Sequence, residues 1–380
     1  MRISVVVPLF NKAPWILRAL SSISAQTRPD FECIVVDDGS TDGSGVLVSR
    51  YPDPRIRLVR QPTGGPGAAR NRGIAEAHGD VFAFLDSDDE WAPTYLESSL
   101  RALEGAGPEV TAVVCGHIRM PEGKTPDRMW NRRGVHEGIF RATPEADPMN
   151  LVHRLAYLSP CATIIRAEAI HRHGGFFARE GCRYAEDAWL FFRVLLNETI
   201  LFRREPLVTF HTDASSLSRN FTGPRPVEPF LMAPEELELS CPKPLKPLLR
   251  EVLSIRASKT ACVLAWWGLR DEALQLLKRF EGERDLNQPW AKAALLATSP
   301  VGLLAGAALR RLKALTTEPP AEHPNFEPVF RPEAELLSEI PEPPMDLPSL
   351  SVAPAAADAS PAKRAAAAIA ELNELAPPGT

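Results

Sequence analysis

The sequence lacks the features of zinc-finger, secreted and membrane-spanning proteins. Its six cysteines form no C-x-x-C pair and no cysteine–histidine spacing typical of a zinc site, so we expect buried, reduced thiols. No uninterrupted apolar run reaches 18 residues, and the nearest, 291–309, contains Lys292 and Pro300. That stretch predicts a buried or interfacial helix. The apolar start is too short for a signal peptide, so the expected location is the cytoplasm, with peripheral association at the inner face of the membrane as a variant.

An excess of basic residues is also missing. The 43 basic and 48 acidic residues give a net charge of −5, and no basic stripe indicates a nucleic-acid partner. Residues 316–380 hold 13 of the 37 prolines and a net charge of −8, which leaves +3 for residues 1–315. A mildly basic body suits a small anionic ligand. The Pro/Ala-rich acidic segment has too few large apolar residues to offset the entropy of ordering, so it predicts a disordered tail with one helix at 362–375.

Short β-branched runs alternate with helical patterns, which predicts an α/β fold with a mainly parallel central sheet. Strands are expected at 3–8, 31–36, 56–59, 81–85, 110–115 and 162–165, and helices from Pro14 and over 44–51, 68–77, 93–103 and 184–198. An irregular insertion is expected at 120–147. The predicted domains are an α/β domain at 1–220, a helical region at 221–315, which could dock on a membrane or a protein, and the tail at 316–380.

Polar clusters follow three of the predicted strands. They are Pro-Leu-Phe-Asn at 8–11, Asp-Asp-Gly-Ser at 37–40 and Asp-Ser-Asp-Asp at 86–89. Ligands of such sheets bind beyond the carboxyl ends of the strands. We therefore expect the three loops to meet at one edge of the sheet and form a binding site.

The acidic turn at 86–89 points to a divalent cation. Asp86 and Asp88 stand two residues apart and Asp89 follows, so three carboxylates would repel one another. Mg²⁺ or Mn²⁺, which prefers hard oxygen ligands, would relieve that repulsion. For Asp89 we favour the alternative that it caps the next helix.

Two further segments carry candidate residues. The glycine-rich stretch at 64–71 matches neither a P-loop nor the Rossmann fingerprint, but helix N-terminal amides and Arg70 could hold a phosphate. Glu186 and Asp187 open a predicted helix, where acids also complement the helix dipole. His211 ends a predicted strand, and a metal-binding and a structural role are equally open for it.

Five segments in order, SVVVPLFNK, IVVDDGSTDGS, GGPGAARNRGIAEAHGD, FLDSDDEW and AEDAW, resemble the family 2 glycosyltransferases over roughly residues 1–215. The resemblance implies the GT-A fold. It also implies an inverting, metal-dependent transfer of a sugar from a nucleotide diphosphate-sugar, with UDP expected, to a hydroxyl of a glycan, lipid-linked or protein acceptor. Cell-envelope polysaccharide synthesis would be a typical setting.

The resemblance implies roles on the donor side. Asp86 would face the nucleotide or donor sugar, and Asp88 would bind the metal. Asp38, with Asp37 as the alternate, would accept the N3 proton of uracil. The remaining donor-side candidates are Pro8 and Phe10 at the base, Ser87 in the acidic motif, and Arg70 and Asn71 beside the donor.

On the acceptor side, the resemblance makes Asp187 the candidate catalytic base and Glu186 a supporting residue, and it places His211 near the metal or the diphosphate. Phe177 stands where many relatives carry an acid after Gly-Gly-Phe, which leaves the acceptor side less defined.

Two other functions stay open. A nucleotidyltransferase would need a glycine-rich basic loop after the first strand, where the sequence has Leu-Phe-Asn-Lys at 9–12. The other is a sugar-nucleotide-binding or scaffolding protein without turnover, against which the three aspartates at 86, 88 and 187 argue.

Overall fold

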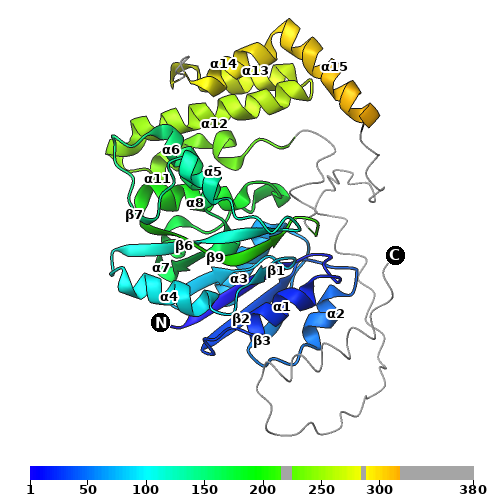
Figure 1. Ribbon diagram of the computed structural model, residues 1–380, viewed down its shortest axis with the longest axis vertical. Coiled ribbons are helices and arrows are strands. Elements are labelled where there is room, and N and C mark those ends of the chain that lie inside the picture. Colours follow the sequence, from blue (N-terminus) through cyan, green and yellow to red (C-terminus); the bar gives the residue numbers. More distant parts are fainter. Residues whose placement is uncertain (215–224, 284–287, 317–380) are drawn as a thin grey trace, which may run out of the picture.

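The computed structural model describes residues 1–214, 225–283 and 288–316. It consists of a nine-stranded sheet with helices on its faces and a helical region beyond one of them (Figure 1). The expected boundary at 220/221 and the expected tail from 317 on, with its helix at 362–375, lie outside the described residues.

The first half of the sheet is parallel. Its strands lie in the order β3-β2-β1-β4. The strands are β1 (Ile3–Leu9), β2 (Phe31–Asp37), β3 (Ile56–Arg60) and β4 (Val81–Phe84), and the helices nearby are α1 (Ile16–Ser24), α2 (Ser44–Ser49), α3 (Pro66–Glu76) and α4 (Tyr95–Gly105). Every strand and helix predicted for this part is present, with ends within a few residues, because continuous apolar runs between turn residues mark buried strands clearly.

Beyond β4 the sheet is mixed. The order continues β8-β6-β9-β5, with β7 paired to β9. These strands are β5 (Glu90–Trp91), β6 (Val110–Met120), β7 (Gly138–Phe140), β8 (Thr163–Arg166) and β9 (Thr199–His211). Only the β6–β9 pair is parallel here. The predicted α/β class is confirmed, but only the strands β3-β2-β1-β4 form a wholly parallel set, since a buried strand has the same pattern in either direction.

The remaining helices lie between and after these strands. The insertion at 120–147 is more ordered than predicted, because it contains α5 and β7. The segments before residue 215 are α5 (Asp127–Arg132), α6 (Pro148–Tyr157), α7 (Ala167–His173) and α8 (Glu186–Asn197), with 3₁₀ turns at Pro160–Ala162 and Arg179–Gly181.

The C-terminal region is helical, as predicted. It contains α10 (Pro229–Met232), α11 (Pro234–Ser240), α12 (Lys246–Trp266), α13 (Arg270–Arg279), α14 (Pro289–Thr298) and α15 (Pro300–Thr316), with 3₁₀ turns at Lys243–Leu245 and Glu281–Glu283. In the described part of the chain, no single helix has the length and hydropathy to cross a membrane. Only α14 and α15 taken together reach that measure, and they are bent by 85° relative to each other.

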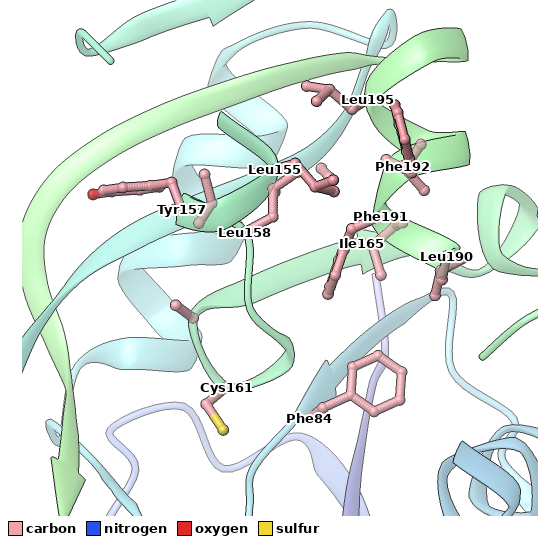
Figure 2. Packing of buried hydrophobic residues seen from close by; sticks show 14 of the residues in the cluster. Phe84, Leu155, Tyr157, Leu158, Cys161, Ile165, Leu190, Phe191, Phe192 and Leu195 are labelled. Atoms are coloured by element: carbon pink, nitrogen blue, oxygen red, sulfur yellow. The ribbon is translucent and has the colours of Figure 1, made fainter. Parts of the chain in front are cut away.

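The core fixes α8 across the middle of the sheet. Phe84 on β4, Ile165 on β8 and Phe191 on α8 are all at most 1% exposed and face one another (Figure 2). The ring of Phe176, 5.0 Å from that of Phe84, fills the space before the helix begins. Burying such side chains contributes roughly 2 kcal/mol each. This packing holds the N-terminus of α8 close to the carboxyl end of β4.

A buried ion pair joins the C-terminal helices to one another. Glu228, just before α10, accepts a 2.6 Å hydrogen bond from Arg256 and a 2.7 Å bond from Thr260, both on α12. The Glu228 side chain is 4% exposed. Because Arg256 and Thr260 of α12 hold the carboxylate, this pairing fixes the start of α10 against α12.

Replacing Glu228 by alanine is expected to destabilise the protein by roughly 3 kcal/mol, because it leaves the Arg256 charge buried without its partner. Urea unfolding followed by circular dichroism measures this. Glu238→Ala is the matched control, since Glu238 pairs with Arg250 on the same helix but in a half-exposed position, where such pairs contribute at most about 1 kcal/mol. Equal losses in the two variants would contradict the structural role of Glu228.

Candidate active site

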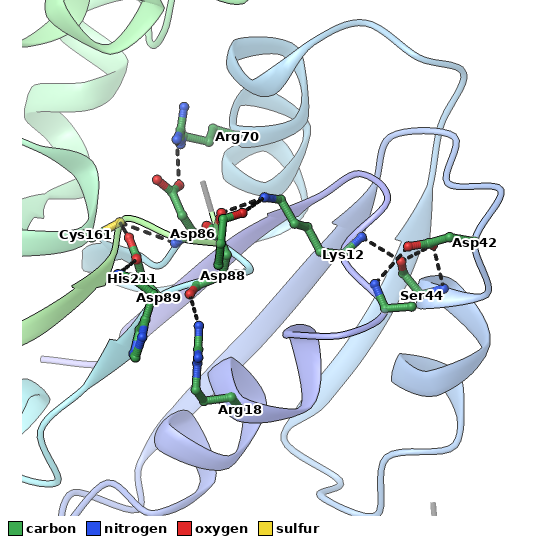
Figure 3. A network of polar contacts seen from close by, with 12 residues as sticks. Lys12, Arg18, Asp42, Ser44, Arg70, Asp86, Asp88, Asp89, Cys161 and His211 are labelled. Carbon is green, nitrogen blue, oxygen red and sulfur yellow. Dashed lines mark hydrogen bonds and ion pairs between the residues drawn. The ribbon is translucent and has the colours of Figure 1, made fainter. Parts of the chain in front are cut away.

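The loops after β1, β2 and β4 meet at one edge of the sheet, as predicted. The amide of Asp38 donates to the carbonyl of Leu9, and the amide of Asn11 donates to Ser40 Oγ, which joins the first two loops. The Lys12 ammonium crosses to Asp88 at 2.6 Å and joins the third (Figure 3). The carboxyl ends of parallel strands bring these residues together.

Each carboxylate of the acidic turn has a different partner. Asp86 Oδ1 accepts a 2.7 Å bond from Arg70, and Asp88 Oδ2 accepts the bond from Lys12. Asp89 accepts a 2.9 Å bond from the backbone amide of His211. The expectation that Asp89 caps the next helix is wrong, because α4 begins at Tyr95 and its N-cap residue is Thr94.

The acidic turn carries more negative charge than its surroundings neutralise. Burial raises the pKa of Asp88, against the opposing effect of Lys12 and with a further rise from Asp86. Burial, followed by the charges of Asp88 and Asp86, raises the pKa of Asp89 well above its ordinary value. Charge crowding of this kind favours a bound cation.

The donor atoms fit a hard divalent ion. A carboxylate oxygen of Asp86, one of Asp89 and Cys161 Sγ all lie within 4.8 Å of one another. Burial raises the pKa of the Cys161 thiol well above its ordinary value, and the thiol is oriented as a donor to Asp89 at 3.7 Å. A protonated thiol is a poor ligand, so the carboxylates are the residues that suit Mg²⁺ or Mn²⁺.

Arg70 joins the two acidic groups of the site. Its side chain is 5% exposed, and it donates one bond to Asp86 and another, of 2.8 Å, to Glu186 at the start of α8. The ring of Phe176 lies 5.2 Å from the guanidinium. The sequence suggested that Arg70 holds a phosphate. In the structure its guanidinium pairs with the two carboxylates and positions them, and its binding of a phosphate stays a prediction.

Asn71 has a similar positioning role. Its Nδ2 donates to the carbonyl of Phe176, and the amide of Phe176 donates to its Oδ1, both at 2.8 Å. A Cβ atom on Gly175, where φ is +74°, would lie 2.5 Å from Asn71 Oδ1. The side chain expected beside the donor thus also fastens the Gly-Gly-Phe turn to α3.

Asp38 holds the glycine-rich loop. It is 3% exposed, and its carboxylate accepts bonds of 2.7–2.8 Å from Gln61 Nε2 and the amides of Gly64 and Gly65. Three of about four lone-pair sites are therefore used inside the protein. Asp37 is also buried and accepts a bond from the Ser40 amide. These internal bonds differ from the expected recognition of a base, and they make Asp38 first of all a positioning residue.

The other donor-side candidates lie at the same edge. Pro8, near the end of β1, and Phe10 are half-buried, whereas Ser87 is buried. The guanidinium of Arg183 lies 5.6 Å from the centre of the Phe10 ring. An aromatic ring and a cation thus stand beside the β1 loop.

Asp187 has the environment of a group that exchanges protons near neutral pH. Burial, and then the neighbouring charge of Glu186, raises its pKa to about 7, while Arg70 opposes the rise. Its Oδ1 accepts a bond from the amide of Ala188. Glu186 is held by Arg70, so the two acids at the start of α8 differ in charge environment.

The His211 ring pairs with a residue just after the acidic turn. Its ring Nε2 lies 2.9 Å from Glu90 Oε1, and its backbone amide is the group that bonds Asp89. This pairing differs from the expected role of its ring at the metal or the diphosphate.

The sequence did not single out Lys12, Arg18 or Cys161. Lys12 Nζ also donates to the carbonyl of Ala214 at 2.8 Å, and Arg18 donates to the carbonyl of Asp88. The position of Lys12 directly after the first strand was a usable signal. Cys161 had none, because only the pairing of β8 with β4 brings it to the acidic turn.

Replacing Arg70 by methionine is expected to destabilise the protein by roughly 3 kcal/mol, since two acidic groups lose their shared buried partner. Chemical unfolding with and without salt measures the loss. Arg72→Met is the control on the same helix, because Arg72 makes a half-exposed pair with Glu76 and should cost under about 0.5 kcal/mol. Similar losses for the two variants would contradict the role of Arg70 in joining the two acidic groups.

Comparison with known proteins supports one family. Residues 4–174 match the sequence model described as Glycosyl transferase family 2. Two relatives from Rhizobium meliloti (strain 1021) are the succinoglycan biosynthesis proteins ExoW, 43% identical over 109 residues, and ExoO, 41% identical over 109 residues. The alignments cover 27% and 28% of this chain, and 34% and 31% of the relatives. The chain thus spans about a third of the length of each of these relatives.

The fold is similar to that of S. aureus TarS residues 1–349, solved in complex with UDP-GlcNAc. The TM-score is 0.55 at 18% identity, and the match covers 82% of this chain and 92% of that one. This likeness confirms the expected GT-A fold. Residues 4–174, which include the strands that carry the acidic turn, are similar in sequence to glycosyl transferase family 2.

Proposed function

We propose that this protein is an inverting, metal-dependent glycosyltransferase that moves a sugar from a UDP-sugar to a hydroxyl group of an acceptor. The observation that carries the proposal is the pair of acidic groups joined by Arg70, with Asp86 on one side and Glu186 and Asp187 on the other. One group serves the donor and the other serves the acceptor.

On the donor side, Asp86 and Asp88 would hold Mn²⁺ or Mg²⁺, with Asp89 close by. The bound cation would stabilise the negative charge that develops on the leaving diphosphate. Lys12 neutralises Asp88 in this structure, so its ammonium group is available for the diphosphate when Asp88 binds another cation. The TarS complex with UDP-GlcNAc supports UDP as the nucleotide.

The uracil ring of the donor would lie against the loops after β1 and β2. Pro8 and Phe10 would form one wall, and the segment that Asp37 and Asp38 hold in place would form the other. The remaining lone-pair site of Asp38 is the acceptor that we assign to uracil N3. Ser87 is buried within the acidic turn, and His211 supports that turn through its amide.

On the acceptor side, Asp187 would act as the base. The acceptor oxygen forms a bond to the anomeric carbon while the bond from that carbon to the diphosphate oxygen breaks, and the hydroxyl proton passes to the Asp187 carboxylate. Attack opposite the leaving group inverts the anomeric configuration. Glu186, neutralised by Arg70, would orient the acceptor rather than take the proton.

The acceptor in this proposal is a polysaccharide. The names of ExoW and ExoO, succinoglycan biosynthesis proteins, favour a growing polysaccharide over a protein acceptor, and a lipid-linked glycan belongs to the same chemistry. A nucleotide-sugar-binding protein without turnover would keep the donor side alone.

UDP together with Mn²⁺ is expected to raise the melting temperature of the full chain more than UDP alone does. Asp88→Asn should weaken Mn²⁺ binding, measured by titration calorimetry or electron paramagnetic resonance, by about tenfold. Asp30→Asn is the control, since Asp30 is exposed in a loop before β2. If no nucleotide shifts the melting curve with or without metal, the donor site is wrongly assigned.

Asp187→Asn is expected to bind UDP as the native chain does but to lose transfer by about 10²-fold or more, because the amide cannot accept the proton. In the native chain, kcat/KM should fall as pH drops below about 7, since burial and the Glu186 charge raise the Asp187 pKa to about 7 and protonation removes the base. Release of free nucleotide with and without acceptor, followed across pH, measures both. Unchanged transfer in this variant, with an unshifted pH profile, would exclude Asp187 as the base.

A further inference from the structure

The last two described helices carry an apolar stripe that faces away from the protein. On α15, Val301 and Leu304 are 72% and 74% exposed, and Leu309 is 52% exposed. With the exposed Ala305 and Ala308, they follow the spacing i, i+3, i+4, i+7 and i+8 of one helix face. A helix in a globular protein normally buries such a stripe.

The stripe continues onto α14. Leu295 and Leu296 are 45% and 65% exposed, and Trp290, whose ring centre lies 5.8 Å from Lys259 Nζ on α12, is 37% exposed. The opposite face of α14, with Ala291 and Ala294 buried, packs on α12. Figure 1 shows the two helices at the end of the molecule that lies farthest from the sheet. Nothing in the described chain covers their outer side chains.

The bend between the helices is built into the chain. Ser299 Oγ accepts a 3.1 Å bond from the amide of Gly302 and donates to the carbonyl of Leu296. A Cβ atom on Gly302 would lie 2.0 Å from that carbonyl oxygen, so only glycine fits. With α14 packed on α12 and the pair bent by 85°, this arrangement suits a surface-bound segment better than a straight span.

The charge on the two helices is of one sign. The sequence from 289 to 316 contains Lys292, Arg310, Arg311 and Lys313 and no acidic residue. A sequence that combines basic residues with exposed leucine, valine and tryptophan is typical of helices that lie in a bilayer interface rich in anionic lipids. Tryptophan prefers the same depth, because its ring is apolar and its N–H is polar.

We propose that α14 and α15 bind the surface of an anionic lipid bilayer, with Leu296, Val301 and Leu304 inserted among the acyl chains. The positive charge of this part of the sequence would attract the anionic lipid head groups. A second copy of the chain would cover the apolar stripe but would not relieve the one-sign charge, and the acidic residues beyond 316 come with few large apolar side chains. The proposal goes beyond sugar transfer and does not depend on it.

The test uses the full chain and vesicle co-sedimentation. Vesicles of phosphatidylcholine with about 30% phosphatidylglycerol should bind the protein, whereas pure phosphatidylcholine vesicles should bind it several-fold more weakly, and added salt should release it. The triple variant Leu296→Glu, Val301→Glu and Leu304→Glu should reduce binding to the anionic vesicles by about tenfold or more.

The matched control is Val46→Glu, Ile139→Glu and Leu239→Glu, which adds the same charge at exposed apolar positions on α2, β7 and α11 and should bind as the native chain does. Melting curves verify that both variants fold. UDP binding, measured on the same variants, separates a failure of vesicle binding from a failure of the donor site. Absence of native binding to anionic vesicles, equal binding to both vesicle types, or equal loss in the control would overturn the proposal. A native dimer that the triple variant converts to a monomer, without vesicle binding, would assign the stripe to a second copy instead.

Discussion

The bonds from Arg70 to Asp86 and Glu186 are the interaction on which the site depends. Asp86 follows β4 and Glu186 begins α8, 100 residues later in the chain. Both acids are close to further carboxylates. Without the shared guanidinium of Arg70 they would repel each other and separate the helix from the sheet. A buried guanidinium with fixed donor geometry suits this task, because it can serve two carboxylates at once.

Hydrogen bonds around α3 hold the Arg70 guanidinium in place. Asp38 fixes the loop that leads into α3, and Asn71 fastens the Gly-Gly-Phe turn to the same helix. Arg70 therefore extends from a helix that is anchored at its start and at its side. The ring of Phe176, packed against Phe84, lies 5.2 Å from the guanidinium, and the Arg70 side chain is 5% exposed. A buried environment of this kind strengthens the interaction of Arg70 with both acids.

Much of the fold could be predicted from the sequence, because it depends on local patterns. Apolar runs ended by Asp, Gly and Asn marked the strands that carry the site, and parallel pairing then required their ends to meet. The antiparallel half of the sheet could not be predicted, since β8 has the same composition as a parallel strand. The order within the 120–147 insertion was also missed, because α5 and β7 are short and have weak periodicity.

The sequence by itself determined the residue types of the site and the edge of the sheet at which they gather. Only the tertiary structure decided what each side chain does there. Arg70, Asn71 and Asp38 stood in motifs that suggested ligand contacts, and the structure shows that each also positions other groups. Cys161 lies at the acidic turn although it belongs to no motif. The physical reason is that hydrogen-bond partners and charge neighbours lie far apart in the chain. A motif states which groups are present, and burial and packing decide which of them remain available to a substrate.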